Sequence, residues 1–151
     1  MKRFFLIFGM IMFATLILSA QGFEPVAWEF SAKKVSKNTF EIHLTASIDY
    51  DWQIYAQTSP EGGALPTQIT FIPNSSVVQV GKVKEIGNLK KKYERVFGIV
   101  TEFYRDSVDF VQIVNLKTDN VVTVKGSVYF MACKNDQCLP PKALEFSVIL
   151  Q

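Results

Sequence analysis

The residues best suited to chemistry in this chain are its two cysteines, Cys133 and Cys138, which have four residues between them. Pro140 and Pro141 follow closely and stiffen the chain, because each proline fixes its own φ angle and restricts the residue before it. A close pair of thiols can form a structural disulfide, bind a metal ion or act as a redox centre. The spacing alone favours the structural disulfide and the redox centre equally, with a metal site the weakest of the three.

Other residues typical of catalysis or metal binding are few. His43 is the only histidine, and it falls on the polar side of an expected strand, so a solvated residue is favoured over a catalytic base. A closed zinc site would need a carboxylate besides this histidine and the two cysteines. The c-type haem motif Cys-x-x-Cys-His is absent. The sequence therefore predicts neither a metal ion nor another cofactor.

The N-terminus predicts export, which decides whether a disulfide can persist. A basic start at Lys2 and Arg3 precedes an apolar run over residues 4–18, and small residues end the segment at Ala20. This order is typical of a secretory signal peptide. A membrane span needs about 20 apolar residues. We therefore expect residues 1–20 to be removed and no stable membrane anchor to remain.

Removal of residues 1–20 changes the charge balance and the size of the chain. The chain loses two of its 16 basic residues, Lys2 and Arg3, and keeps its 14 acidic ones, so its net charge falls close to zero. This balance gives no reason to expect a nucleic-acid partner. Residues 21–151 are long enough for one domain with a sizeable apolar core.

Residues 21–151 read as β-strands almost throughout. Residues 39–48 alternate strictly between apolar and polar side chains, and clusters of Gly, Pro, Asn and Asp separate the strand-like runs. The basic run at residues 90–95 is expected to be a solvated loop. Many short strands without a helical period predict an all-β, immunoglobulin-like β-sandwich. The expected strands are 26–30, 39–48, 52–57, 67–72, 77–83, 97–104, 108–114, 121–130 and 144–150.

The cysteine pair falls between the last two expected strands, 121–130 and 144–150, and therefore at one end of the sandwich. An immunoglobulin-type structural disulfide instead joins distant strands across the core. A disulfide over so short a loop stabilises by about 2 kcal/mol in the chain-entropy model, and a core rich in Phe, Val and Ile does not depend on that. A redox pair needs neighbouring, accessible thiols in a rigid frame, which this position offers.

Three segments together resemble one known family. The first reads VYFMACKNDQCLPPKALEFSVIL over residues 128–150 and resembles the cysteine hairpin in the N-terminal domains of DsbD, the thiol:disulfide interchange protein. The second reads RVFGIVTEFYRDSVDFVQIV over residues 95–114 and resembles its cap loop with the Tyr-Arg-Asp segment after it. The third reads DYDWQIYAQT over residues 49–58 and resembles the segment whose aromatic residues flank the cysteines. The similarity spans about residues 25–150.

The resemblance implies an immunoglobulin-like domain in which Cys133 and Cys138 form a redox pair and Cys138 is the sulfur joined to partner proteins. It also implies that Phe97 caps the disulfide and that Tyr55 lies beside it. This sequence departs from the family pattern in three ways. One residue fewer lies between the cysteines than in the best-known members, the acidic pair before the cap aromatic is not present, and Gln53 stands where a second tyrosine is expected.

The resemblance further implies a periplasmic protein of a Gram-negative bacterium that relays two electrons. A thioredoxin-fold protein or a membrane-embedded thiol reductase, each on a separate chain, would reduce the Cys133–Cys138 disulfide, and the dithiol would reduce oxidised client proteins. The alternative is a non-catalytic exported β-sandwich that binds a partner and uses the same bond as a structural loop disulfide. The redox potential distinguishes the two, because structural disulfides in secreted proteins usually lie below about −300 mV.

Overall fold

The computed structural model describes residues 22–60, 62–95, 98–135 and 137–151, so the expected signal peptide lies outside the described residues. Twelve strands and no helix occur within these ranges, and hence no helix there is long and apolar enough to cross a membrane. The strands are β1 (Val26–Lys34), β2 (Thr39–Ile48), β3 (Gln53–Tyr55), β4 (Gln68–Phe71), β5 (Val77–Gly87), β6 (Lys90–Glu94), β7 (Ile99–Tyr104), β8 (Ser107–Leu116), β9 (Val122–Phe130), β10 (Ala132–Lys134), β11 (Gln137–Cys138) and β12 (Lys142–Leu150).

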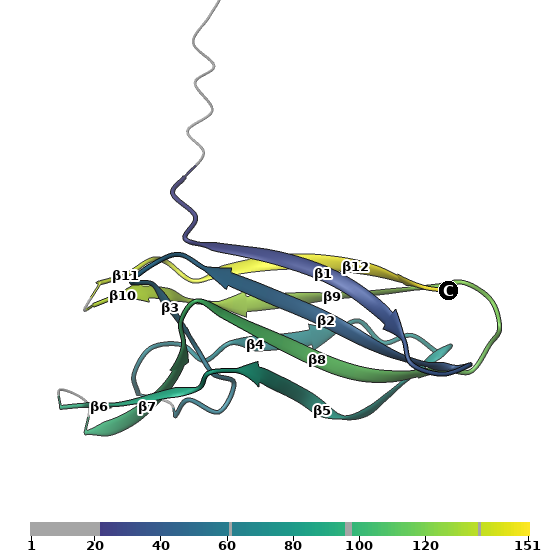
Figure 1. The fold of residues 1–151 in the computed structure, drawn as a ribbon, viewed down its shortest axis with the longest axis horizontal. Coiled ribbons are helices and arrows are strands. Elements are labelled where there is room, and N and C mark those ends of the chain that lie inside the picture. The colour runs from purple at the N-terminus through teal and green to yellow at the C-terminus, as the bar shows by residue number, and fades with distance from the viewer. Residues whose placement is uncertain (1–21, 61, 96–97, 136) are drawn as a thin grey trace, which may run out of the picture.

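The strands form three antiparallel sheets (Figure 1). A four-stranded sheet of order β1-β2-β8-β5 and a three-stranded sheet of order β12-β9-β4 are the two layers of a sandwich. The strands β1 and β12 lie side by side along one border of it. A five-stranded sheet of order β11-β10-β3-β7-β6 extends the molecule at the end opposite the C-terminus. The predicted all-β, immunoglobulin-like sandwich is confirmed.

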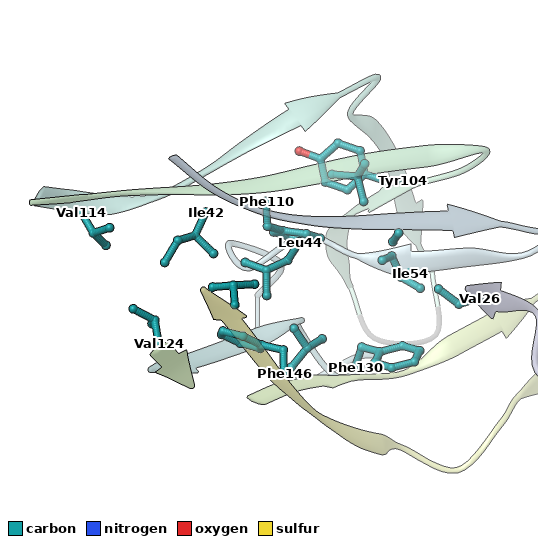
Figure 2. Packing of buried hydrophobic residues seen from close by; sticks show 14 of the residues in the cluster. Val26, Ile42, Leu44, Ile54, Tyr104, Phe110, Val114, Val124, Phe130 and Phe146 are labelled. Carbon is teal, nitrogen blue, oxygen red and sulfur yellow. The ribbon is translucent and has the colours of Figure 1, made fainter. Parts of the chain in front are cut away.

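The core lies between the two sandwich sheets, whose apolar side chains point toward one another (Figure 2). Every second residue of β2 from Phe40 onward is buried, and so is every second residue of β9 from Val122 onward. Figure 2 shows Leu44 and Phe110 on one side of this space and Phe146 on the other. A strand presents alternate side chains to one face, so the strict alternation in the sequence becomes a continuous apolar layer.

Gly126 in β9 marks the closest approach within the three-stranded sheet. Phe146 of β12 and Phe71 of β4 both stand opposite this glycine in register. A Cβ atom at Gly126 would lie 2.4 Å from Cζ of Phe146 and 2.3 Å from the carbonyl oxygen of Thr70. Glycine is therefore required here, because a neighbouring ring and backbone occupy the space of a side chain.

The basic run at residues 90–95 differs from its expectation as a loop. Lys90–Glu94 form β6, an edge strand that pairs with β7. Lys91 Nζ lies 2.6 Å from Glu102 Oε1 on the neighbouring strand. Lysines are suited to an edge strand because their charge discourages pairing with a further chain. The run is therefore an edge strand whose charges protect it from pairing with a further chain. It contains no alternation of apolar residues by which the sequence could have identified it as a strand.

Candidate redox site

Cys133 and Cys138 face each other across the hairpin of β10 and β11 and are joined by a disulfide, with their Cα atoms 4.0 Å apart. As expected, the hairpin lies between β9 and β12, at one end of the sandwich (Figure 1). In the adjacent pair, Leu139 N donates a hydrogen bond to Ala132 O at 2.9 Å. Hydrogen-bonded and non-hydrogen-bonded pairs alternate in an antiparallel ladder. The cysteines therefore occupy a non-hydrogen-bonded position, where facing Cα atoms come closest.

A tight turn sets the register of the two sulfurs. Lys134 pairs with Gln137 at the end of the hairpin, and Asn135 in the turn adopts a φ of 52°. Asparagine tolerates this left-handed region better than most residues, and such turns match the twist of the flanking strands. The four residues between Cys133 and Cys138 thus place the cysteines one pair beyond the flanking pair Lys134–Gln137, which is the shortest hairpin spacing that sets two cysteines at a non-hydrogen-bonded pair.

The two cysteines differ in exposure. Cys133 is 0% exposed, whereas Cys138 is exposed on the edge strand β11. Cys133 packs with Tyr55 and Phe103 in a cluster of its own, separate from the main core, and Met131 packs against that cluster. Cys138 is therefore the cysteine that a protein approaching from solvent meets first.

Tyr55, which the resemblance places beside the disulfide, is 5% exposed and belongs to the same cluster as Cys133. Burial raises the pKa of its phenol, and a hydrogen bond that Gln53 Nε2 donates to the Tyr55 hydroxyl at 3.1 Å opposes this in part. The phenol therefore stays neutral near pH 7, and its ring forms an apolar wall for the inner cysteine.

Two residues without an expected role, Arg105 and Phe103, also lie at this site. Arg105 Nη2 donates a hydrogen bond to Gln53 Oε1 at 3.1 Å, and the guanidinium carbon of Arg105 lies 5.4 Å from the centroid of the Phe103 ring. Gln53, noted in the sequence only as a replacement for tyrosine, is 4% exposed and pairs in register with Cys133. The alternation of side chains along an extended chain was the one signal in the sequence, because it places residues 103 and 105 on the same side.

The predicted cap residue, Phe97, lies outside the described residues. The residues around it are described: Gly98 has a φ of 67°, and its N–H donates to Glu94 O at 2.8 Å, which closes the β6–β7 hairpin. This hairpin and the cysteine hairpin extend from the same end of the molecule (Figure 1). Burial is the main cause of the raised pKa of Tyr55, and the charges of Glu94 and Lys92 on β6 act on it in opposite directions.

A shallow apolar groove begins next to Cys138. Its lining includes Leu139 and Pro140, which follow Cys138, and Phe23 and Pro25, which precede β1. Lys142 forms an ion pair with Glu24 at its border. The chain that precedes β1 therefore contributes to the surface around the exposed cysteine.

His43 lies on the polar face of β2, as expected, but it is held by carboxylates. Its Nδ1 lies 2.7 Å from Asp109 Oδ2, and its Nε2 lies 3.5 Å from Glu41 Oε2. Its side chain is 22% exposed. His43 is thus a partnered strand residue in the four-stranded sheet, and the cysteine hairpin belongs to another sheet.

The comparison with protein families agrees with this fold and with the hairpin disulfide. A family model described as "Thiol:disulfide interchange protein DsbD, N-terminal" matches residues 21–149. This match covers most of the chain, and the chain belongs to that family.

Two solved structures have the same fold. The N-terminal periplasmic domain of ScsB from Proteus mirabilis matches with a TM-score of 0.52 and 19% identity, over 83% of this chain and 44% of that one. The DsbD N-terminal domain of Neisseria meningitidis in the reduced form matches with a TM-score of 0.52 and 14% identity, over 82% of this chain and 83% of that one. The chain thus spans less than half of the ScsB chain. A sequence comparison with curated proteins gives no match.

Proposed function

We propose that this protein is exported to the periplasm, with residues 1–20 as its signal peptide, and that the domain of residues 21–151 relays two electrons through Cys133 and Cys138. Membership of the DsbD N-terminal family supports thiol–disulfide interchange as the chemistry. The observation that carries the proposal is the asymmetry of the disulfide, which has one exposed and one buried cysteine on facing strands. Exchange requires one sulfur open to a partner and a second sulfur close enough to resolve the mixed disulfide.

The reaction begins when a thiolate of a reducing partner attacks Cys138 Sγ. The Cys133–Cys138 bond breaks, its electron pair leaves on Cys133 Sγ, and a mixed disulfide joins Cys138 to the partner. The second thiol of the partner then attacks the partner sulfur that is bonded to Cys138. This step releases Cys138 as a thiolate, so that two electrons have passed to this protein. The same steps in reverse order reduce a client disulfide.

Two kinds of partner fit this chemistry. Electrons would come from a thioredoxin-fold protein or from a membrane-embedded thiol reductase and would pass to oxidised client proteins. Dithiols in such partners supply the attacking thiolate and the resolving thiol that the two steps require. The exposed position of Cys138 on an edge strand supports direct docking of a folded partner there.

Trapping of mixed disulfides tests the proposal. Cys133→Ala leaves Cys138 without its resolving thiol, so this variant should accumulate a disulfide-linked thioredoxin-fold protein in the periplasm. Cys138→Ala, the matched control, should trap little or nothing, because Cys133 is buried. Thiol-released proteins would be identified by mass spectrometry. Equal trapping by both variants would contradict the assignment, and no trapping together with a potential below about −300 mV would favour the structural disulfide.

Access to the disulfide should depend on Phe97 and Tyr55. The family resemblance gives Phe97 the role of a cap over the sulfurs, and the burial of Tyr55 against Cys133 supports its role as the wall beside them. Phe97→Ala should increase the rate of disulfide reduction by glutathione, measured by the appearance of free thiol. Tyr93→Ala, at an exposed aromatic residue of the same hairpin, is the control. An unchanged rate in Phe97→Ala would remove Phe97 from the site.

A further inference from the structure

A row of four side chains crosses the five-stranded sheet and ends at the disulfide. Cys138 pairs in register with Cys133, and Cys133 pairs with Gln53. Arg105 directly follows the last residue of β7, one position beyond the pair of Ile54 with Tyr104, and extends the row. Its Nη2 donates a hydrogen bond to Gln53 Oε1 at 3.1 Å. Side chains directly opposite each other in an antiparallel sheet share one face, with Cβ atoms about 4.5–5.5 Å apart. Gln53 is therefore the only residue of the row between the guanidinium and the inner cysteine.

Arg105 determines which way the Gln53 amide points. A guanidinium carries donors only, so the amide must turn its oxygen toward Arg105 and its NH₂ group away from it. One N–H of that group donates to the Tyr55 hydroxyl at 3.1 Å. The second N–H can donate to the next side chain in the row, Cys133, when the sulfur of Cys133 is a thiolate and accepts a hydrogen bond.

The charge of Arg105 is not cancelled by a carboxylate within the described part of the chain. Its Nε is buried there without a hydrogen-bond acceptor, and none of the ion pairs includes its guanidinium. Two other cations of the same sheet are paired with carboxylates. Lys134 Nζ lies 3.6 Å from Asp51 Oδ2, and on β6 Lys92 Nζ lies 3.1 Å from Glu94 Oε1.

We propose that Arg105, acting through the amide of Gln53, stabilises the thiolate that forms on Cys133 whenever the disulfide opens. This inference rests on the proposed function, because it assigns a positioning role within that exchange. A thiolate inside the apolar cluster of Tyr55 and Phe103 is costly, since burial disfavours the charged form. A hydrogen bond from an amide polarised by a cation offsets part of that cost.

The Cys133 thiolate takes part in both directions of the exchange. When a partner thiolate attacks Cys138 Sγ, the electron pair of the broken bond leaves on Cys133 Sγ. In the reverse step, Cys133 Sγ attacks Cys138 Sγ and expels the partner as a thiolate. Stabilisation of this thiolate makes Cys133 a better leaving group and favours the reduced form of the protein, which raises the redox potential.

The test compares Arg105→Met and Gln53→Met with Arg105→Lys and Lys90→Met in the exported protein. Lys90→Met is the matched control, because Lys90 is a partly buried cation of the same sheet outside the row. The first measurement is the equilibrium constant for reduction of the disulfide by glutathione. Arg105→Met and Gln53→Met should each lower it about tenfold, which corresponds to about 30 mV. Arg105→Lys should lower it less, and Lys90→Met should change it less than about threefold.

The second measurement is the pH midpoint of thiolate absorbance at 240 nm in the Cys138→Ala background, where Cys133 is the one remaining thiol. Arg105→Met should move this midpoint upward by about one pH unit, and Lys90→Met should leave it in place. Circular dichroism checks the fold of each variant, and Gln53→Met keeps the test open if Arg105→Met does not fold.

Three results would overturn the inference. The first is a folded Arg105→Met whose equilibrium constant and pH midpoint are both unchanged. The second is a change in Lys90→Met as large as that in Arg105→Met, and the third is a lower equilibrium constant in Arg105→Met without a similar decrease in Gln53→Met. Neither measurement uses a partner protein. Failure of the trapping experiment would therefore refute the proposed relay without affecting this test, and failure here would leave the relay standing.

Discussion

The sandwich body (β1, β2, β4, β5, β8, β9 and β12) and the cysteine end (β3, β6, β7, β10 and β11) differ in the length of their strands and in the share of polar side chains among those that they bury. The body fills its interior with alternating apolar residues from strands that are mostly nine to eleven residues long. The strands of the cysteine end have two to six residues. Gln53 and Thr101 are nevertheless buried there, and Gln112 is the one buried polar side chain that the described residues of the body contain.

This difference separates stability from chemistry. Apolar burial contributes about 25 cal/mol for each Å² removed from water, so the long strands of the body hold the fold whatever the state of the cysteines. Buried polar groups stabilise a protein only when their hydrogen bonds are made. The cysteine end therefore depends on its network, and the reactive sulfur can change partners without loss of the core.

The largest expected effect on stability is in the body. Phe110 is 0% exposed, and its ring packs 5.8 Å from that of Trp28. Phe110→Ala should lower the free energy of unfolding by about 3–5 kcal/mol, since it removes a large buried side chain and leaves a cavity. Phe103→Ala at the cysteine end should cost less, because its cluster has only three buried members in the described residues. Denaturant unfolding measures both, and a larger loss in Phe103→Ala would reverse the comparison.

An added methyl group should be the next most damaging change. Gly126→Ala would set a Cβ atom 2.3 Å from the carbonyl oxygen of Thr70, so strands β4 and β9 must move apart. Overpacking of this kind costs about 1–3 kcal/mol, and contact with the backbone favours the upper part of that range. Thermal unfolding gives the value. Ser127→Ala, one residue away, is the control and should change stability by less than about 0.5 kcal/mol.

Reduction of the disulfide should have a smaller effect on stability. The bond closes a short loop between residues five positions apart, and the chain-entropy model gives such a loop about 2 kcal/mol. We expect the reduced protein to keep its sheets and to unfold in a single transition at a slightly lower denaturant concentration. Loss of the near-ultraviolet circular dichroism of the core on reduction would show that the body depends on the cysteine end.

The smallest effect concerns alkaline pH at the border of the two regions. Burial and the hydrogen bond to Glu85 raise the pKa of the Tyr104 phenol above its ordinary value of about 10. The folded protein then holds this proton more tightly than the unfolded chain does. The stabilisation is complete below about pH 10 and is lost progressively above it, by about 1 kcal/mol over the first pH unit.

Tyr104→Phe isolates this contribution. The variant should be less stable at neutral pH, because a buried hydrogen bond is removed, yet its stability should fall less steeply above about pH 10. Unfolding midpoints measured between pH 8 and pH 11 compare the two proteins. Equal slopes would assign the alkaline loss to other tyrosines, of which Tyr55 also has a raised pKa.

The sandwich was predictable because its signal is local. Alternation along residues 39–48 identifies the buried face of β2 without knowledge of its neighbours, and the cysteine pair was correctly placed on the connection between the last two expected strands. Strand β6 was not predictable in this way, since lysines on an edge strand carry no apolar alternation. Strands β10 and β11 are too short to leave a pattern, and β10 exists through its pairing with β3, which is distant in sequence.

The network behind Cys133 escaped prediction for a related reason. Gln53, Phe103 and Arg105 are ordinary residues in the sequence, and what joins them is the register of three strands that lie far apart along the chain. A shift of one residue in that register would turn Arg105 to the opposite face. The sequence shows which residues lie on the same side of each strand, but not which strand lies beside it.

The local nature of the cysteine hairpin also has a consequence for how the chain folds in an oxidising compartment. With two cysteines in the chain, only one intramolecular disulfide can form, so oxidation cannot produce a scrambled isomer that must later be reshuffled. Closure of a loop of about ten residues takes about 10–100 ns, and this loop is shorter. Pairing of β2 with β8 joins residues sixty or more positions apart and must come later. The order of oxidation and folding should therefore make little difference to the native product, and oxidised and reduced chains should fold at similar rates.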